Sequence, residues 1–363
     1  MFTRRTTLKM MGAAGTTLAA HNPLFSSMAK PRENTSSVAR ILFGSCANQD
    51  KEQPIWAPIN ALNPDLFIFL GDNIYGDTRD MAVLAEKYKK FERIDGFKKL
   101  RKNTPVIATW DDHDYGENDA GHEYPQKEKS KELFFDFWNE PQDSNRRRSD
   151  DGIYTSYMYG PDHERVQVIL LDLRWNRTAL KHVTRAEAKR RDQMAFGPYI
   201  PNEDPNAAML GEKQWAWLEA ELRKPAKLRI IGSSLQFIST FPGWEAWSLF
   251  PNERQRMIDL ITKTRAEGVL FISGDTHWAE ISRQTTKAPY PLYDFTSSGL
   301  TETWHNMSPN AYRLPGCMYT KANFGIVEID WRVPDPHIVL QARNVGGFPV
   351  FEKSLLLSQL SFT

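Results

Sequence analysis

The chain has 363 residues, of which 25% are charged and 40% are hydrophobic, a composition typical of a globular protein that buries a sizeable core. Its 46 lysines and arginines nearly balance its 45 aspartates and glutamates, which excludes a protein that binds nucleic acid or an anionic membrane through a strongly basic surface. Two cysteines, Cys46 and Cys317, allow one disulfide but exclude a disulfide framework.

Residues 1–29 have the pattern of an export signal. Residues 3–9, TRRTTLK, are similar to a twin-arginine motif and precede a mildly apolar stretch over 10–20. We therefore expect a twin-arginine-type signal peptide, the twin-arginine export machinery as a partner, and a periplasmic or secreted protein. A basic helix with a disordered tail is the alternative. No later segment reaches about 18 continuous apolar residues, so no transmembrane anchor is expected.

Strands and helices are predicted to alternate through the middle of the chain. Apolar runs predict strands over 38–43, 65–70, 105–109, 165–171, 227–231 and 268–273, with a half-exposed strand at 154–159. Helical spacing of apolar residues predicts helices over 81–102, 127–139, 211–223 and 252–265, the last capped by Asn252. Residues 176–209 are polar and basic and contain several prolines, which indicates a long surface excursion.

Beyond His277 the pattern changes to strands alone. Short alternating segments predict strands over 279–286, 292–297, 324–331 and 336–343, as in antiparallel sheet. No low-complexity linker separates this part from the preceding one. The sequence therefore predicts one continuous α/β domain over 38–363, with two mixed sheets flanked by helices.

Three clusters of acidic residues and histidine follow predicted buried strands. They are GDNIY at 71–75, WDDHD at 110–114 and GDTH at 274–277. The carboxyl ends of strands form the crevice where an open α/β sheet binds ligands, so the clusters can converge although they are distant in sequence. Convergent carboxylates repel one another unless a cation holds them. The clusters therefore predict a metal site.

Six motifs in a fixed order extend this pattern. They are GSC at 44–46, GDNIY at 71–75, WDDHD at 110–114, LDLR at 171–174, LGxxQxxWL at 210–218 and GDTH at 274–277. Over roughly residues 40–300 the chain resembles the PhoD-type alkaline phosphatases, within the calcineurin-like metallophosphatase superfamily. The resemblance implies an α/β/β/α metallophosphatase sandwich and a phosphodiesterase or alkaline phosphatase activity on small or polymeric phosphoesters.

The first metal position is expected to hold ferric iron. The thiolate of Cys46 and the phenolate of Tyr75 suit a Lewis-acidic ion, because coordination lowers the pKa of each group enough to ionise it near neutral pH. His277 would complete this site with a neutral imidazole nitrogen. The resemblance implies that Asp72 bridges the two metals, which its two carboxylate oxygens allow.

The second metal position is surrounded by oxygen atoms. Asp72, Asp112 and Asp275 are its expected ligands, with Asp111 and Asn118 as further candidates. Hard carboxylates favour calcium, magnesium or manganese over zinc, and the resemblance implies calcium.

Two further residues are expected to act on the substrate. His113 is placed to stabilise the transition state or to protonate the leaving group, and Arg174 to hold a phosphate oxygen with its planar guanidinium. A metal pair about 3.5 to 4 Å apart clamps a phosphoryl group and supplies a bound hydroxide. The expected function is an exported metal-dependent phosphohydrolase.

Two alternatives from other classes stay open. The first is a non-catalytic exported protein that binds a metal or a carbohydrate on the same scaffold. The second is a metallo-oxidase that uses the iron. A complete set of metal ligands and the presence of His113 argue against the non-catalytic protein. Thiolate and phenolate ligands stabilise ferric iron, which argues against the oxidase. Contacts that select the substrate are expected from the loops at 176–209, 240–250 and 301–320, and Trp278 either belongs to the core or stacks on a substrate.

Overall fold

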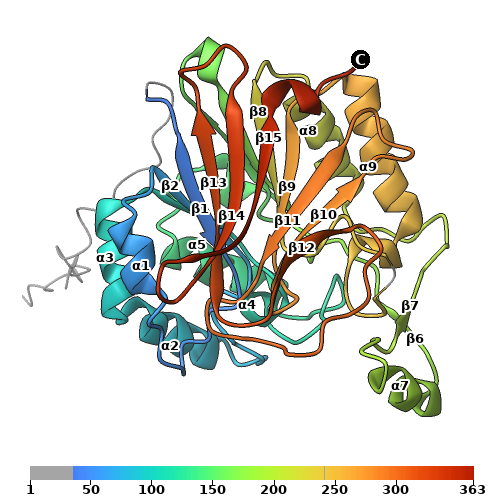
Figure 1. The fold of residues 1–363 in the computed structure, drawn as a ribbon. Coiled ribbons are helices and arrows are strands. Elements are labelled where there is room, and N and C mark those ends of the chain that lie inside the picture. The colour runs from blue at the N-terminus through green and yellow to red at the C-terminus, as the bar shows by residue number, and fades with distance from the viewer. Residues whose placement is uncertain (1–35, 241) are drawn as a thin grey trace, which may run out of the picture.

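The computed structural model describes residues 36–240 and 242–363, so the predicted signal peptide lies outside the described residues. Two mixed sheets lie side by side along the middle of the molecule (Figure 1). In spatial order, the six-stranded sheet contains β15 (Pro349–Leu356), β14 (His337–Asn344), β13 (Asn323–Asp330), β1 (Arg40–Gly44), β2 (Leu66–Leu70) and β3 (Val106–Thr109). The seven-stranded sheet contains β12 (Arg313–Tyr319), β10 (Ala279–Gln284), β11 (Leu292–Ser297), β9 (Val269–Ser273), β8 (Leu228–Ser233), β5 (Val166–Leu170) and β4 (Thr155–Tyr159).

The seven-stranded sheet has a parallel centre and antiparallel edges, whereas the six-stranded sheet is parallel from β1 to the edge strand β3 and antiparallel in its other half. β1, β2 and β3 run parallel, as do β5, β8, β9 and β11. Their residues are almost all buried, which explains the continuous apolar runs in the sequence. β1 also pairs antiparallel with β13. Strands from the first and the last parts of the chain therefore belong to the same sheet.

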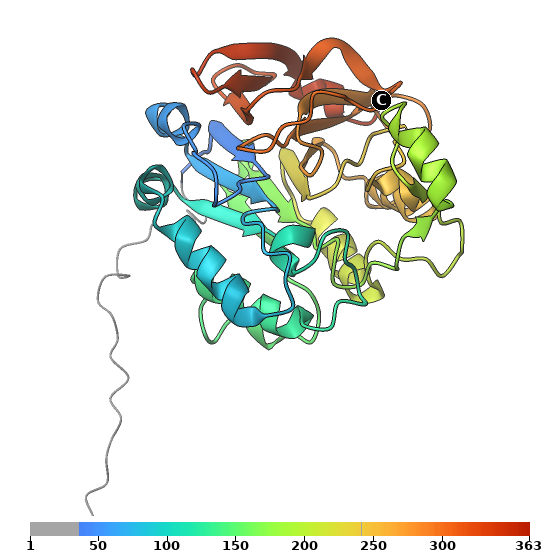
Figure 2. The ribbon, with the colours of Figure 1, turned by 90° about the horizontal axis from the view of Figure 1, so that it is seen from below.

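Helices cover the outer faces of the sheets (Figures 1 and 2). The side of the six-stranded sheet carries α1 (Trp56–Ala61), α2 (Met81–Glu92), α3 (Asp95–Asn103) and α5 (Lys127–Phe137), and the side of the seven-stranded sheet carries α8 (Glu212–Leu222) and α9 (Pro251–Thr264). The prediction of an α/β/β/α sandwich with mixed sheets is confirmed. No helix in the described part of the chain is both long and apolar enough to cross a membrane.

The remaining elements are short. They are α4 (Asp112–Tyr115), α6 (Asn145–Arg148), α7 (Arg185–Asp192), the two-residue strands β6 (Lys181–His182) and β7 (Tyr199–Ile200), and the 3-10 turns η2 (Asp162–Glu164), η3 (Trp247–Leu249) and η4 (Leu357–Leu360). β6, α7 and β7 form the excursion predicted over 176–209, and they project from the body of the molecule (Figure 1).

Two apolar cores hold these layers together. The larger core joins the facing sides of the sheets, where the rings of Phe43 and Phe295 meet edge to face with centroids 4.9 Å apart. The second core lies between the six-stranded sheet and its helices, around the fully buried Trp56. The indole of Trp56 packs against Phe67, Phe69, Phe91 and Phe97.

The structure corrects two helix predictions. The helix expected over 81–102 is broken into α2 and α3, and at Gly96, near the start of α3, an added Cβ would lie 2.4 Å from the Cβ of Trp56. The close packing of α3 on α1 therefore requires glycine there. Asn252 is not the cap of α9, since Phe250 occupies that position and Pro251 begins the helix, where its missing N–H costs nothing.

Replacing Trp56 by alanine should destabilise the protein by about 3 to 5 kcal/mol, because it leaves a cavity among four phenylalanine rings. Urea unfolding followed by tryptophan fluorescence and circular dichroism measures the change. The matched control is Val83→Ala on the exposed side of α2, for which a change within about 0.5 kcal/mol is expected. Equal effects of the two substitutions would contradict this account of the core.

Candidate metal centre

The predicted ligands lie on loops that follow neighbouring strands. Cys46 follows β1 and Asp72 follows β2, and the backbone N–H groups of Cys46 and Ala47 donate to the carbonyl oxygens of Gly71 and Asp72 at 3.4 and 2.8 Å. The loop after β9 joins them, since Gly274 lies so close to Ser45 that an added Cβ would be 2.6 Å from its hydroxyl. Close backbone contact therefore brings these loops together.

Four of the predicted ligands have a left-handed backbone. The φ angles are 63° at Cys46, 48° at Asp72, 70° at Asp275 and 62° at His277. Residues other than glycine adopt this conformation rarely, and at functional sites the surrounding structure enforces it. Here it turns the four side chains away from the course of their strands.

Cys46, Asp72 and His277 form the first ligand group. One potential ligand atom from each lies within 4.8 Å of the others, and the Sγ of Cys46 is 3.3 Å from Oδ2 of Asp72. The hydroxyl of Tyr75 is 3.1 Å from Nε2 of His277 and 3.5 Å from Oδ2 of Asp72. The structure thus brings together the four residues predicted for the first metal position.

Two more ligand groups continue from the first. Asp72, Asp112 and His113 form one group, and Asp112, Asp119 and Glu245 form the other, each with atoms within the same 4.8 Å limit. Asp72 is common to the first two groups and Asp112 to the last two. The carboxylates therefore form a connected row.

Sequence reasoning missed Asp119 and Glu245. Glu245 lies in the loop between β8 and η3, and Asp119 lies beyond α4, so neither directly follows a buried strand. A weak signal was available for Asp119, since it adjoins Asn118. The structure leaves Asn118 exposed and outside the three groups, whereas the Asp119 backbone N–H donates to Oδ2 of Asp112 at 2.7 Å.

Asp275 faces the same region without belonging to the three groups. It is partly buried, and its backbone carbonyl oxygen lies 3.8 Å from the Sγ of Cys46. Burial and the charges of Asp111, Glu245 and Asp112 raise its pKa well above the usual value.

Arg174 is enclosed by acidic side chains. Its guanidinium is 0% exposed and lies 2.6 Å from Asp111, 2.8 Å from Glu245 and 3.8 Å from Asp112. The equally buried Arg177 lies 3.1 Å from Glu245. Arg174, predicted to hold a phosphate oxygen, and Asp111, a candidate metal ligand, thus bind each other in a buried ion pair.

His113 lies at the edge of the row and retains some exposure. Its Nδ1 is 2.7 Å from Oδ1 of Asp77, and its ring lies 4.2 Å from that of Tyr75. Burial lowers the pKa of the imidazole, but the charges of Asp112, Asp72 and Asp77 outweigh that effect and raise the pKa to about 11. These carboxylate charges therefore favour the protonated imidazole, and Asp77 occupies its Nδ1.

Asp72 and Cys46 are buried with little compensating charge. Burial is the largest cause that raises the pKa values of both groups well above their usual range. The charge of His113 lowers the pKa of Asp72, the neighbouring carboxylates raise it, and the charge of Asp72 raises the pKa of Cys46. Oδ1 of Asp72 is buried and makes no hydrogen bond. Buried carboxylates that lack donors either bind protons or bind cations. The donor set of thiol, phenol, imidazole and carboxylates fits a pair of metal ions.

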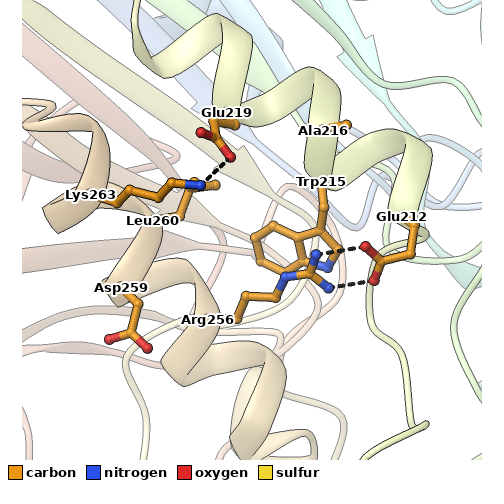
Figure 3. A pocket seen from close by; sticks show the side chains of 8 residues that line it. All are labelled: Glu212, Trp215, Ala216, Glu219, Arg256, Asp259, Leu260 and Lys263. Carbon is orange, nitrogen blue, oxygen red and sulfur yellow. Dashed lines mark hydrogen bonds and ion pairs between the residues drawn. The ribbon is translucent and has the colours of Figure 1, made fainter.

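A separate groove of 380 Å³ lies between α8 and α9 (Figure 3). Its charged side chains pair with one another, as Arg256 does with Glu212 and Lys263 with Glu219. The residues that line it belong to none of the three ligand groups. It therefore contributes nothing to the metal centre.

The sandwich and its row of strand-end ligands define a metallophosphatase-type fold. The structure is similar to the solved structure of PhoD (TM-score 0.64, 14% identity, covering 90% of this chain and 69% of that one). It is also similar to a dimetal phosphatase from Danio rerio (TM-score 0.51, 14% identity, covering 90% and 100%). A third similar structure is GAP50, the anchor in the inner membrane complex of Plasmodium (TM-score 0.55, 12% identity, covering 90% of both chains). At these identities the likeness shows the fold.

Residues 41–311 match the family model of the PhoD-like phosphatases. The chain belongs to this family, as its motifs predicted. Alkaline phosphatase D of Bacillus subtilis (strain 168) is 25% identical over an alignment of 257 residues, and the match covers 59% of this chain and 42% of that protein. The matched region thus spans less than half of that relative.

Replacing Arg174 by methionine should destabilise the protein by about 3 to 5 kcal/mol, because the substitution leaves Asp111 buried without a cation and Glu245 with Arg177 alone. Urea unfolding of metal-free protein measures the loss. Arg332→Met is the matched control, because Arg332 pairs with Asp330 at the surface and its loss should leave the unfolding midpoint unchanged. A variant that loses substrate affinity at full stability would show instead that Arg174 binds phosphate.

Proposed function

We propose that this chain is an exported metal-dependent phosphohydrolase that cleaves phosphodiesters and phosphomonoesters. The observation that carries the proposal is the sharing of Asp72 and Asp112 between adjacent ligand groups. A shared carboxylate keeps two cations a few ångströms apart, as a two-metal phosphohydrolase requires. Membership of the PhoD-like phosphatase family supports the same reaction.

The ligand types favour two different ions. Cys46, Tyr75, His277 and Asp72 would hold ferric iron, since thiolate and phenolate suit a Lewis-acidic ion. The oxygen ligands of Asp72, Asp112 and Asp275 would hold calcium, with magnesium, manganese or zinc as alternatives.

Further oxygen ligands to the second ion would come from Asp119 and Glu245. Their ligand atoms lie within 4.8 Å of Asp112. Their place in a ligand group with Asp112 favours them over Asn118, which is exposed, and over Asp111, which belongs to none of the three groups.

The chain's own groups would orient the substrate and supply a proton. When bound, the two ions would neutralise phosphoryl oxygens and acidify the attacking water. His113 would donate a proton from Nε2 to the departing alkoxide, because its Nδ1 is held by Asp77. The carboxylate row, held at one end by the buried Arg174, would orient the phosphoryl group toward His113.

The alternative is a non-catalytic metal- or carbohydrate-binding protein. Fold alone does not decide between the two, since one protein with a similar fold is described as an anchor. His113 favours the enzyme, because an imidazole that a carboxylate orients at the edge of the row is placed to transfer a proton.

Export and domain organisation belong to the same proposal. The arginine pair at 4–5 and the apolar stretch after it support transport by the twin-arginine machinery to the periplasm or beyond. A single catalytic domain over 38–363 is supported by the pairing of β1 with β13 and by the core that joins both sheets.

Asp72→Asn should reduce the hydrolysis of bis(p-nitrophenyl) phosphate to background while the fold is kept. The amide lacks the charge that two adjacent ligand groups share. Release of p-nitrophenol measures activity, and circular dichroism checks the fold. Asp330→Asn, at the surface, is the matched control and should keep full activity. Unchanged turnover in the Asp72 variant would overturn the assignment.

His113→Gln should lower kcat by about 10²- to 10⁴-fold, since the glutamine cannot donate a proton as an acid. KM should change much less, because the ligands of both ions that we propose remain. The test substrate is a phosphodiester with an alkyl leaving group, whose departure needs protonation. A loss equally large with p-nitrophenol, a far better leaving group, would argue against proton donation.

A further inference from the structure

Two tryptophans at the rim of the metal centre are tied to its ligands. The backbone N–H of Trp304 donates to the carbonyl oxygen of His277 at 3.0 Å. In the same loop, the N–H of Thr301 donates to the carbonyl oxygen of Cys46 at 3.0 Å. This loop is thus anchored at both ends of the first ligand group.

The second tryptophan comes from the opposite loop. Trp244 immediately precedes Glu245, which belongs to the third ligand group. The rings of Trp244 and Trp304 meet with centroids 5.3 Å apart and an angle of 62° between their planes. The two indoles therefore connect the loops on either side of the row of ligands.

The indole of Trp304 faces both the metal centre and the solvent. Its ring lies 5.1 Å from the ring of His277, in an edge arrangement, and 6.4 Å from that of Trp278. Trp304 is nevertheless 40% exposed, whereas Trp278 is buried with its Nε1 3.1 Å from Glu280. Trp278 thus belongs to the core, and Trp304 is the ring available to a substrate.

The exposed part of Trp304 lies on a ring that contacts His277. A group that covers this apolar surface beside the metal centre removes it from water, which favours binding. Trp304 is held by its backbone and by three neighbouring rings, so a group that stacks on it would cost little side-chain freedom. A planar ring gains more from such a rigid face than a flexible acyl chain, which would lose rotamer freedom.

We propose that Trp304, supported by Trp244, binds the aromatic ring of an ester group. The preferred substrates are then phosphoesters that carry a planar ring, such as an aryl group or a nucleobase. This inference rests on the proposed function, because a phosphoryl group held at the metal centre is what places its ester group beside His277.

Two phosphonates that differ only in the ring test the inference. Calorimetry on the metal-loaded full chain compares phenylphosphonate with methylphosphonate. Trp304→Ala should weaken phenylphosphonate binding by about 10- to 100-fold, the usual range for loss of one stacking contact, and leave methylphosphonate binding unchanged. Trp304→Phe should keep most of the preference. Trp217→Ala, a half-buried tryptophan on α8 that packs on Tyr154, is the matched control and should alter neither affinity.

Other outcomes separate the two proposals. Equal weakening of both phosphonates, or loss of bound metal from the Trp304 variants, would show that Trp304 only supports His277 and would overturn the inference. An unchanged preference for phenylphosphonate in Trp304→Ala would overturn it as well, with the proposed function intact. If the metal-loaded wild-type chain bound neither phosphonate, the phosphoryl site and this inference would fail together.

Discussion

The burial of several carboxylates close to one another is the constraint on which the rest of this structure depends. Parallel strands in two facing sheets end at the same side of the molecule, so the side chains that follow them must meet. Asp72 and Asp112 meet there with little access to water. Their mutual repulsion in a low-dielectric setting must be balanced by bound protons or by cations. The left-handed backbone at Cys46, Asp72, Asp275 and His277 is the conformational cost of aiming these groups at one place.

Arginine side chains of the protein balance the negative charge at one end of the row. The negative charge at the other end is not balanced in this way. At one end of the row, the guanidinium groups of Arg174 and Arg177 neutralise Asp111 and Glu245 without any exposed surface. At the other end, no guanidinium group of the described residues pairs with Cys46 or Asp72, His113 is the cationic group near Asp72, and one oxygen of Asp72 lacks a hydrogen bond. This end of the row and the carboxylates that adjacent ligand groups share therefore have capacity for metal ions.

The strand-end ligands were predictable because each follows a buried strand whose apolar run stands out in the sequence. That pattern located Cys46, Asp72, Asp112 and His277, and the two-sheet fold followed from the alternation of strands and helices. Glu245 lies in a long loop without periodicity, so only the folded chain shows its contact with Arg174. The enclosure of Arg174 was equally hidden, since local sequence does not record which acids surround a guanidinium. Strands β12 and β15 and helix α7 were missed because β12 and β15 lie at sheet edges with exposed faces and α7 buries no residue.

Elemental analysis of the purified, folded chain tests the central claim most directly. Iron and calcium would be counted per chain in the wild type and in Asp72→Asn, after incubation with both ions and removal of the excess. The account predicts about one iron together with calcium in the wild type and a loss of bound metal in the variant, because Asp72 is common to two ligand groups. A folded wild-type chain that stays free of metal, or a variant that binds as much metal as the wild type, would contradict it.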